Sequence, residues 1–198
     1  MATKPISTGT RLTIAEFLDL PDTELREKME LDDGELYIMP RPRPVHQFLV
    51  FWLGWYFANY INSFADPPAE VYPDMVVILS REPRRVLAPD FAIILTGNPY
   101  QIVGGYFEGI PDIMVEVLST DRRRDLVRKR QLYAEAGVLE YWIVDPRDDT
   151  VTLLELRDEE YTERAMLTVS DTLTTPLLPG LAIPLNDVFR HRQRPADD

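Results

Sequence analysis

The segment Ile113-Met114-Val115-Glu116-Val117-Leu118 constrains the fold of this chain most, because it is apolar on both faces apart from one acid. Pro111 precedes it and Ser119 follows it, and both residues favour turns. Successive strand side chains point to opposite faces, so a strand that is apolar on both is covered on both. We therefore expect a central strand on which Glu116 is buried, and a buried charge is costly without a partner or a metal.

A helix is predicted from Arg124 to Ala136, with Gly137 as its left-handed cap. Its outward face is expected to be polar and to consist of Arg124, Arg128, Gln131 and Glu135. Residues at spacings of three and four form the inward face: Leu126, Lys129, Leu132, Tyr133 and Ala136. Lys129 is the one charged residue in this apolar stripe, and we expect it to point inward.

A third acid/base residue, Asp90, begins another strand that is apolar on both faces, Pro89 to Leu95. If this strand is the neighbour of the strand that carries Glu116, the two carboxylates converge. Like charges at short range must protonate or share a cation. Oxygen ligands suit Mg²⁺ or Mn²⁺ best.

The rest of the chain completes an α/β (α+β) pattern, a mixed β-sheet flanked by helices. A capping box at Thr13 and Glu16 predicts a short helix that ends near Pro21. The aromatic segment Phe48 to Ile61 predicts a long core helix. Strands are expected at 28–31, 35–39, 70–79, 86–95, 140–144, 150–156 and 161–167, with a loop over 171–184.

Length and composition fit one compact domain, since 198 residues with 45% hydrophobic side chains can bury a full core. We expect an N-terminal segment over 1–12, a single domain over 13–190 and a flexible tail over 191–198. The chain has no cysteine, which excludes disulfides and thiol nucleophiles and makes the reducing cytoplasm the natural compartment.

No membrane association is expected from the sequence. The N-terminus lacks the apolar region of a signal peptide, and the longest apolar stretch, Phe48 to Ile61, has 14 residues against about 18 for a membrane span. The aromatic side chains in this stretch lie nearly all around the helix: Phe48, Phe51, Trp52, Trp55, Tyr56 and Phe57. Part of its surface could therefore pack against a second subunit, so a homodimer is a plausible assembly.

The net charge of −12 argues against broad, non-specific binding to a polyanion. One segment is nevertheless strongly basic, with Arg122, Arg123, Arg124, Arg128, Lys129 and Arg130 within nine positions. This segment could receive a phosphate backbone. The alternative is a solvated helix with ordinary charge pairs such as Asp125 with Lys129.

Several catalytic signatures are absent from the sequence, including phosphate-binding Gly-rich loops and the Gly-x-Ser-x-Gly elbow. Only two histidines are present, His46 and His191. His191 lies in the polar tail, and His46 stands at the entry of the long helix, where a capping or packing role is expected.

A family resemblance covers residues 13 to 188, nearly the whole chain. It is carried by Met29 to Leu36, Pro89-Asp90, Val115 to Ser119, Lys129 with Tyr133, and Gly137 to Pro146. This ordered series resembles the putative restriction endonuclease-like proteins of bacteria, in the PD-(D/E)XK nuclease superfamily. The resemblance implies a restriction-endonuclease-like core in which Asp90 and Glu116, with the Val117 carbonyl, hold Mg²⁺ or Mn²⁺.

The same resemblance assigns three further residues. Glu30 is the acid of the N-terminal element, close enough to influence a metal or its water. The usual lysine position, two residues after the acid, is Leu118 here. The lysine resembles one that has moved to the following helix, which selects Lys129, and Tyr133 on the same helical face supports it.

These residues imply a nuclease that hydrolyses the phosphodiester bonds of DNA with Mg²⁺. One alternative is a catalytically inactive nuclease fold that serves as a binding or assembly module, in which the same residues form a buried ion-pair cluster. A weaker alternative is a metal-dependent hydrolase that acts on a small phosphorylated molecule.

Overall fold

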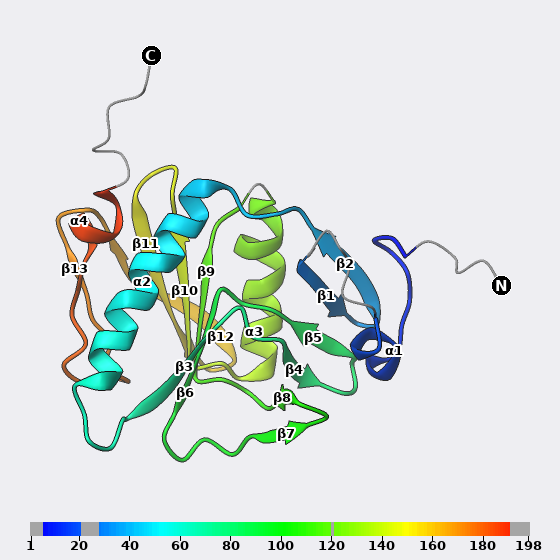
Figure 1. Cartoon of the computed structure of the whole chain (residues 1–198). Coiled ribbons are helices and arrows are strands. Elements are labelled where there is room, and N and C mark those ends of the chain that lie inside the picture. The colour runs from blue at the N-terminus through cyan, green and yellow to red at the C-terminus, as the bar shows by residue number, and fades with distance from the viewer. Residues whose placement is uncertain (1–5, 21–27, 120, 191–198) are drawn as a thin grey trace. The chain divides into compact units, whose positions relative to one another are not determined.

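The computed structural model describes residues 6–20, 28–119 and 121–190, which form two compact units (Figure 1). The first unit holds the described residues of Met1–Arg41, Met75–Ala88 and Pro99–Ile110. The second holds those of Pro42–Asp74, Pro89–Asn98 and Pro111–Asp198. The single domain expected over 13–190 stays a prediction, and the flexible tail expected over 191–198 lies outside the described residues.

The first unit is a six-stranded sheet with the strand order β2-β1-β5-β4-β8-β7. Its elements are α1 (Ile14–Leu18), β1 (Lys28–Asp32), β2 (Glu35–Met39), β4 (Val77–Ser80), β5 (Arg85–Leu87), β7 (Gln101–Val103) and β8 (Tyr106–Glu108). The predicted capping box is present, since Glu16 N donates to Thr13 Oγ1 and Thr13 N donates to Glu16 Oε2. The predicted hairpin is also present, and Asp33 and Gly34 turn it with positive φ angles.

The second unit contains the other six-stranded sheet, with the order β12-β11-β10-β9-β6-β3. Its elements are α2 (Pro44–Asn62), β3 (Ala69–Pro73), β6 (Phe91–Leu95), β9 (Ile113–Val117), the π-helical turn η1 (Arg124–Lys129), α3 (Arg130–Ala136), β10 (Glu140–Asp145), β11 (Thr150–Arg157), β12 (Glu160–Leu167), the pair β13 (Thr172–Leu173) and β14 (Ile183–Pro184), and α4 (Leu185–Val188). β9 and β10 are parallel and the other neighbours in the sheet are antiparallel. The expected mixed sheet with flanking helices is confirmed.

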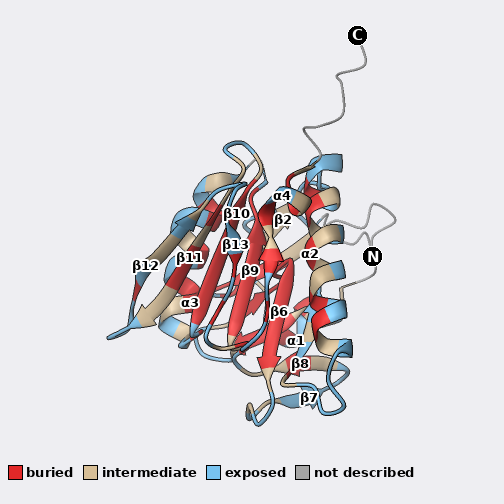
Figure 2. Ribbon diagram, turned by 90° about the vertical axis from the view of Figure 1, so that its left-hand side faces the viewer, coloured by how far each residue is buried: buried red, intermediate tan, exposed pale blue. Residues whose placement is uncertain are grey.

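Helix α2 covers one face of the second sheet and supplies much of its core. Its side chains Leu49, Leu53 and Phe57 pack against Val115 and Trp142 in the main apolar cluster. Each such side chain contributes about 1.5 to 3 kcal/mol when it is fully buried. The buried strands β6, β9 and β10 lie between α2 and α3 (Figure 2). The strand that carries Glu116 is therefore central, as its two apolar faces predict.

Two predicted strands are divided in the structure. The expected strand 70–79 becomes β3 and β4, and the expected strand 86–95 becomes β5 and β6, with the halves in different sheets. Asp74 has a positive φ of 49°, which ends β3, and Pro89 has no backbone N–H to continue the ladder between β5 and β6. Periodicity alone does not mark these breaks, because both halves of each segment are apolar.

Short elements also occur where none was expected. β7 and β8 form a hairpin through Gly104 and Gly105, whose φ angles are 61° and 88°. A Gly-Gly pair is a recognised turn signal, so the sequence contained the evidence for this hairpin. The expected loop over 171–184 contains the β13–β14 pair. No helix in the described part of the chain is long and apolar enough to cross a membrane.

Candidate active site

Asp90 and Glu116 stand on neighbouring chain segments in the second unit. The antiparallel pairing of β6 with β9 matches Phe91 with Val115, so one further step in the register places Asp90 opposite Glu116. Both are buried, with 6% and 2% of their surfaces exposed. The two strands are therefore neighbours, which is the condition under which the sequence predicts that the two carboxylates converge.

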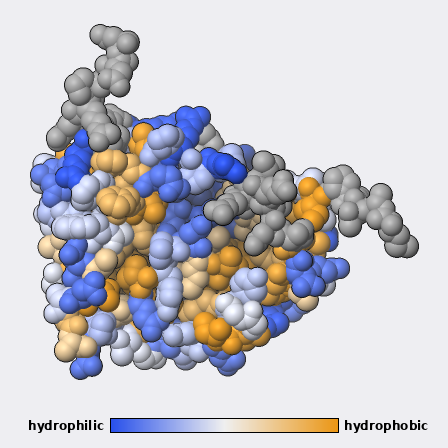
Figure 3. All heavy atoms as spheres, in the orientation of Figure 1, coloured by the Kyte–Doolittle hydropathy of each residue, from blue (hydrophilic) through white to orange (hydrophobic). Residues whose placement is uncertain are grey.

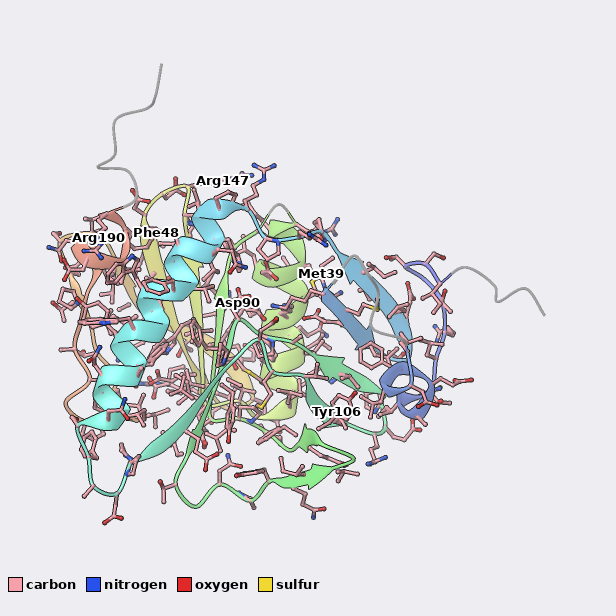
Figure 4. All side chains as sticks on the ribbon, viewed as in Figure 1. Met39, Phe48, Asp90, Tyr106, Arg147 and Arg190 are labelled. Atoms are coloured by element: carbon pink, nitrogen blue, oxygen red, sulfur yellow. The ribbon has the colours of Figure 1, made fainter. Side chains whose placement is uncertain are left out.

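The carboxylate of Asp90 is held by two donors at one oxygen. The backbone N–H of Val117 donates to Oδ2 at 2.7 Å, and His46 Nε2 lies 3.0 Å from the same atom. Pairing with β6 ends at Phe91, so the Asp90 side chain takes the N–H that a longer strand would have bound. Asp90 lies between the ribbons of α2 and α3 in the view of Figure 4.

Glu116 receives two donors from the helix that follows its strand. Lys129 Nζ donates to Oε1 at 2.7 Å and Tyr133 OH donates to the same oxygen at 2.8 Å. Lys129 is 1% exposed and Tyr133 is fully buried. Val115 and Val117 pack in the cluster beneath α2, so alternation turns Glu116 to the opposite face, toward α3. The predicted inward orientation of Lys129 is confirmed.

The helix carrying Lys129 begins with a π-helical turn over η1, and this corrects two predicted orientations. Arg124 was expected to face solvent and Leu126 to face the core, whereas Arg124 is 7% exposed and Leu126 is 36% exposed. A π turn has more residues than an α turn, so the residues that precede Lys129 are shifted around the helix by about one position. Arg124 and Asp125 therefore turn inward. π turns of this kind are frequent at functional sites.

The site is acidic. Asp125 is a third buried carboxylate, 3.6 Å from Lys129 Nζ at its Oδ1. Burial raises the pKa of Tyr141 well above its usual 10, and the negative charges of Glu116, Asp125 and Asp90 raise that pKa further. Three buried carboxylates therefore act on one neighbourhood, and Lys129 Nζ lies beside two of them.

Glu30, the fourth predicted site residue, belongs to the first unit. Its side chain is fully buried, and its Oε1 accepts a hydrogen bond of 3.2 Å from the backbone N–H of Ala88, two residues before Asp90 in the chain. The predicted influence of Glu30 on a metal stays a prediction.

Much of the basic segment is engaged inside the protein. Arg122 makes a two-pronged ion pair with Asp145, with distances of 2.8 and 2.5 Å, and Arg130 Nη2 donates to the Tyr161 carbonyl at 2.8 Å. Arg123 is exposed. Fewer cations of this segment are therefore left for a phosphate backbone, because the guanidinium groups of Arg122 and Arg130 are bound to β10 and β12.

The Arg122–Asp145 pair predicts a pH dependence of stability. Hydrogen bonds from Arg122, and then the backbone N–H of Arg147, lower the pKa of Asp145 below its usual 3.8, while burial opposes them. Because the folded-state pKa is depressed, this stability is fully present above the unfolded pKa and is lost as the pH falls through the folded pKa.

We expect Asp145→Asn to lower the free energy of unfolding by about 1 to 3 kcal/mol at neutral pH. The difference from wild type should shrink below about pH 4. Urea unfolding of wild type and Asp145→Asn from neutral pH to below about pH 4 measures this difference in the free energy of unfolding. A difference that stays constant down to low pH would show that the carboxylate charge is not responsible.

Sequence reasoning missed His46 as a neighbour of the site. A packing role was expected, yet the imidazole contacts Asp90 directly. A histidine in a mainly apolar helix without Asp, Glu, Lys or Arg was the available signal. Within the part of the chain that the structure describes, Asp112, four residues before Glu116, is not bound to the residues of the site. It accepts hydrogen bonds from Leu95 N and Asn98 Nδ2, so it stabilises a turn.

The donor atoms at Asp90 and Glu116 suit a hard divalent cation. Within the described residues, no three His, Cys, Asp or Glu side chains form a metal-binding group by themselves. Mg²⁺ commonly takes only one or two carboxylates and completes its shell with water and substrate phosphate. The N–H of Val117 points to Asp90, and in a strand the carbonyl of the same residue points to the same edge, which adds a third oxygen.

Comparisons with known proteins agree with this fold. Residues 14–186 match the Uma2 family, described as "Putative restriction endonuclease". The crystal structure of a putative nuclease belonging to DUF820 from Anabaena variabilis is similar, with a TM-score of 0.69 and 21% identity over 90% of this chain and 97% of that one. This similarity confirms the nuclease-like fold class. No curated protein matches the chain. Since the family match spans most of the sequence, the chain belongs to the Uma2 family of putative restriction endonucleases.

Proposed function

We propose that this protein is a divalent-metal-dependent nuclease that hydrolyses phosphodiester bonds of DNA. The observation that carries the proposal is the buried pair of acids formed by Glu116 on β9 and Asp90 just before the neighbouring β6, with Lys129 bound to Glu116. Membership in a family of putative restriction endonucleases supports a nucleic-acid substrate.

Asp90, Glu116 and the Val117 carbonyl would hold Mg²⁺ or Mn²⁺. Such an ion lowers the pKa of water and polarises a phosphate. Lys129 supplies a fixed positive charge beside Glu116, where it can orient the attacking water or balance charge that develops on the phosphate. Tyr133 fixes the Glu116 carboxylate through its hydroxyl. Glu30 is proposed to act from the N-terminal element.

Cleavage of polymers by the wild-type protein tests the proposal. The substrates are supercoiled and linear DNA, single-stranded RNA and nucleoside triphosphates, each with Mg²⁺, with Mn²⁺ and with EDTA. We expect DNA cleavage that requires the divalent ion. Turnover of nucleotides alone would favour the small-molecule hydrolase, and inactivity on all substrates would contradict the proposal.

A catalytically inactive binding module is the second candidate, because Lys129 already neutralises Glu116 at 2.7 Å. An internal ion pair needs no metal, whereas a set of carboxylates built for a cation is stabilised when the cation binds. Thermal unfolding of EDTA-treated protein with and without added Mn²⁺ separates the two. An increase in the unfolding temperature supports the nuclease, and no change supports the module.

We infer a cytoplasmic setting from the cysteine-free sequence.

We also propose that two copies associate through α2 and β3. Phe51 and Trp55 are 63% and 46% exposed on a helix that has no charged residue. Both side chains line a groove of about 610 Å³. Val50, Gly54, Ala58 and Ile61 of α2 line it together with Val71 and Pro73 of the edge strand β3. Apolar surface is interspersed with polar groups on this side of the molecule (Figure 3).

A protruding aromatic pair and an apolar groove in the same patch suit a two-fold contact, in which each copy fills the groove of the other. We expect Trp55→Glu to shift the wild-type dimer to monomer in sedimentation velocity experiments. Ile102→Glu is the matched control, since Ile102 is 62% exposed on β7, outside the patch. A wild-type protein that stays monomeric at high concentration would refute this contact.

A further inference from the structure

His46 is a buried histidine at the start of a mainly apolar helix. It is the third residue of α2 and is 8% exposed, and the helix contains no Asp, Glu, Lys or Arg. A polar ring at such a position loses its hydration, so its two nitrogens need partners. One of them, Nε2, is hydrogen-bonded to Asp90.

The bond to Asp90 fixes which nitrogen carries the proton. An ionised carboxylate only accepts hydrogen bonds, so Nε2 must be the donor at 3.0 Å. Val117 N–H donates to the same oxygen, Oδ2, at 2.7 Å. Two donors from different elements, α2 and β9, therefore hold one oxygen and restrict the rotation of the carboxylate about its last bond.

The other nitrogen, Nδ1, is buried and has no hydrogen-bond partner among the described residues. An unsatisfied buried acceptor costs about 1 to 3 kcal/mol, and such atoms are rare in native proteins. If the histidine only packed the helix, an apolar side chain would avoid this cost. The hydrogen bond from Nε2 to Asp90 is the feature that an apolar side chain could not supply.

We propose that His46 is a positioning residue of the metal site, which holds the Asp90 carboxylate in the orientation that binds the divalent ion. This inference rests on the proposed metal-dependent function. Hydrogen-bond partners of ligating side chains typically change metal affinity by about 10- to 100-fold when they are replaced. His46 is thus expected to act through Asp90 and not on the substrate.

Three substitutions separate positioning from packing. His46→Gln places an amide N–H near the position of Nε2 and keeps a donor for Asp90. His46→Asn is too short to reach Asp90 with its amide, and His46→Leu fills the space without any donor. The readouts are the dissociation constant for Mn²⁺ by calorimetry and the unfolding temperature in EDTA, both on the full chain.

We expect His46→Leu and His46→Asn to weaken Mn²⁺ binding by about 10- to 100-fold and His46→Gln to stay within about threefold of wild type. Thermal unfolding in EDTA should show that the variants compared are folded, and either His46→Leu or His46→Asn suffices if the other does not fold. Wild-type affinity for Mn²⁺ in His46→Leu, or an equal loss of Mn²⁺ affinity in His46→Gln and His46→Leu, would overturn this inference and leave the proposed function standing. No Mn²⁺ binding in the wild type would overturn the proposed function, and the inference with it.

Discussion

Replacing Glu116 with glutamine is expected to reduce metal-dependent DNA cleavage by about 10³-fold or more in a protein that remains folded. Glutamine keeps an acceptor oxygen for Lys129 and Tyr133, which bind Glu116 at 2.7 and 2.8 Å, and removes the negative charge that a cation needs. A divalent ion contributes several kcal/mol to such reactions, and each ~1.4 kcal/mol is tenfold in rate. Asp90→Asn should have a similar effect. Initial rates on supercoiled DNA measure both.

Asp112→Asn is the matched control for these two substitutions. It also neutralises an acid next to β9, but its carboxylate binds the backbone of Leu95 and the Asn98 side chain instead of the site. Cleavage by this variant should stay near the wild-type rate. If Glu116→Gln cleaved DNA as fast as wild type, with the same requirement for metal, the assignment of Glu116 would be wrong.

The second large effect is on stability. Lys129→Met is expected to lower the free energy of unfolding by about 3 to 5 kcal/mol at neutral pH, because it leaves Glu116 buried without its cation. Adding Glu116→Gln to this variant removes the unpaired charge and should recover much of the loss. Denaturant unfolding of the single and double variants measures this coupling.

Arg123→Met serves as the control, since Arg123 is exposed beside η1 and its loss should change stability by about 0.5 kcal/mol or less. A Lys129→Met protein as stable as the control would mean that Glu116 finds another partner or is protonated. Because Lys129→Met is expected to be less stable than wild type, metal binding by the two proteins must be compared at equal folded fractions.

The central strand, the following helix and the next strand could be predicted because local pattern and burial agree there. Ile113 to Val117 is buried throughout, and Gly137 ends the helix with a φ of 91°. The first hairpin is similar, since Asp33-Gly34 determines its turn wherever the strands pack.

The strand breaks and the π turn could not be predicted from periodicity. Asp74 ends β3 through its backbone conformation, and the apolar residues on both sides of it give one continuous signal. The orientation of Arg124 and Leu126 depends on one extra residue in a helical turn, which shifts the register without changing composition. The contacts that buried polar residues make in the folded protein decide where such a strand break or helical shift occurs.

The burial of Asp90, Glu116, Lys129 and Tyr133 could be predicted because each is polar at a position that its apolar neighbours mark as buried. His46 was missed because its partner Asp90 is 44 residues away and the helix between them gives no sign of it. A buried acid alone is also no proof of a site. Glu140 is 2% exposed, yet Trp142 Nε1 and Thr175 Oγ1 bind it at 2.7 Å in a structural network.

Calorimetric titration of Mn²⁺ into metal-free wild type and Glu116→Gln tests the metal site most directly. Both proteins are first shown to be folded, and a non-cleavable phosphodiester oligonucleotide is present in a parallel series so that a phosphate can complete the coordination. We predict saturable binding to the wild type and none, or binding weaker by about 100-fold, to Glu116→Gln. Equal affinity in the two proteins, or no binding to either with the oligonucleotide present, would contradict a metal site at Asp90 and Glu116.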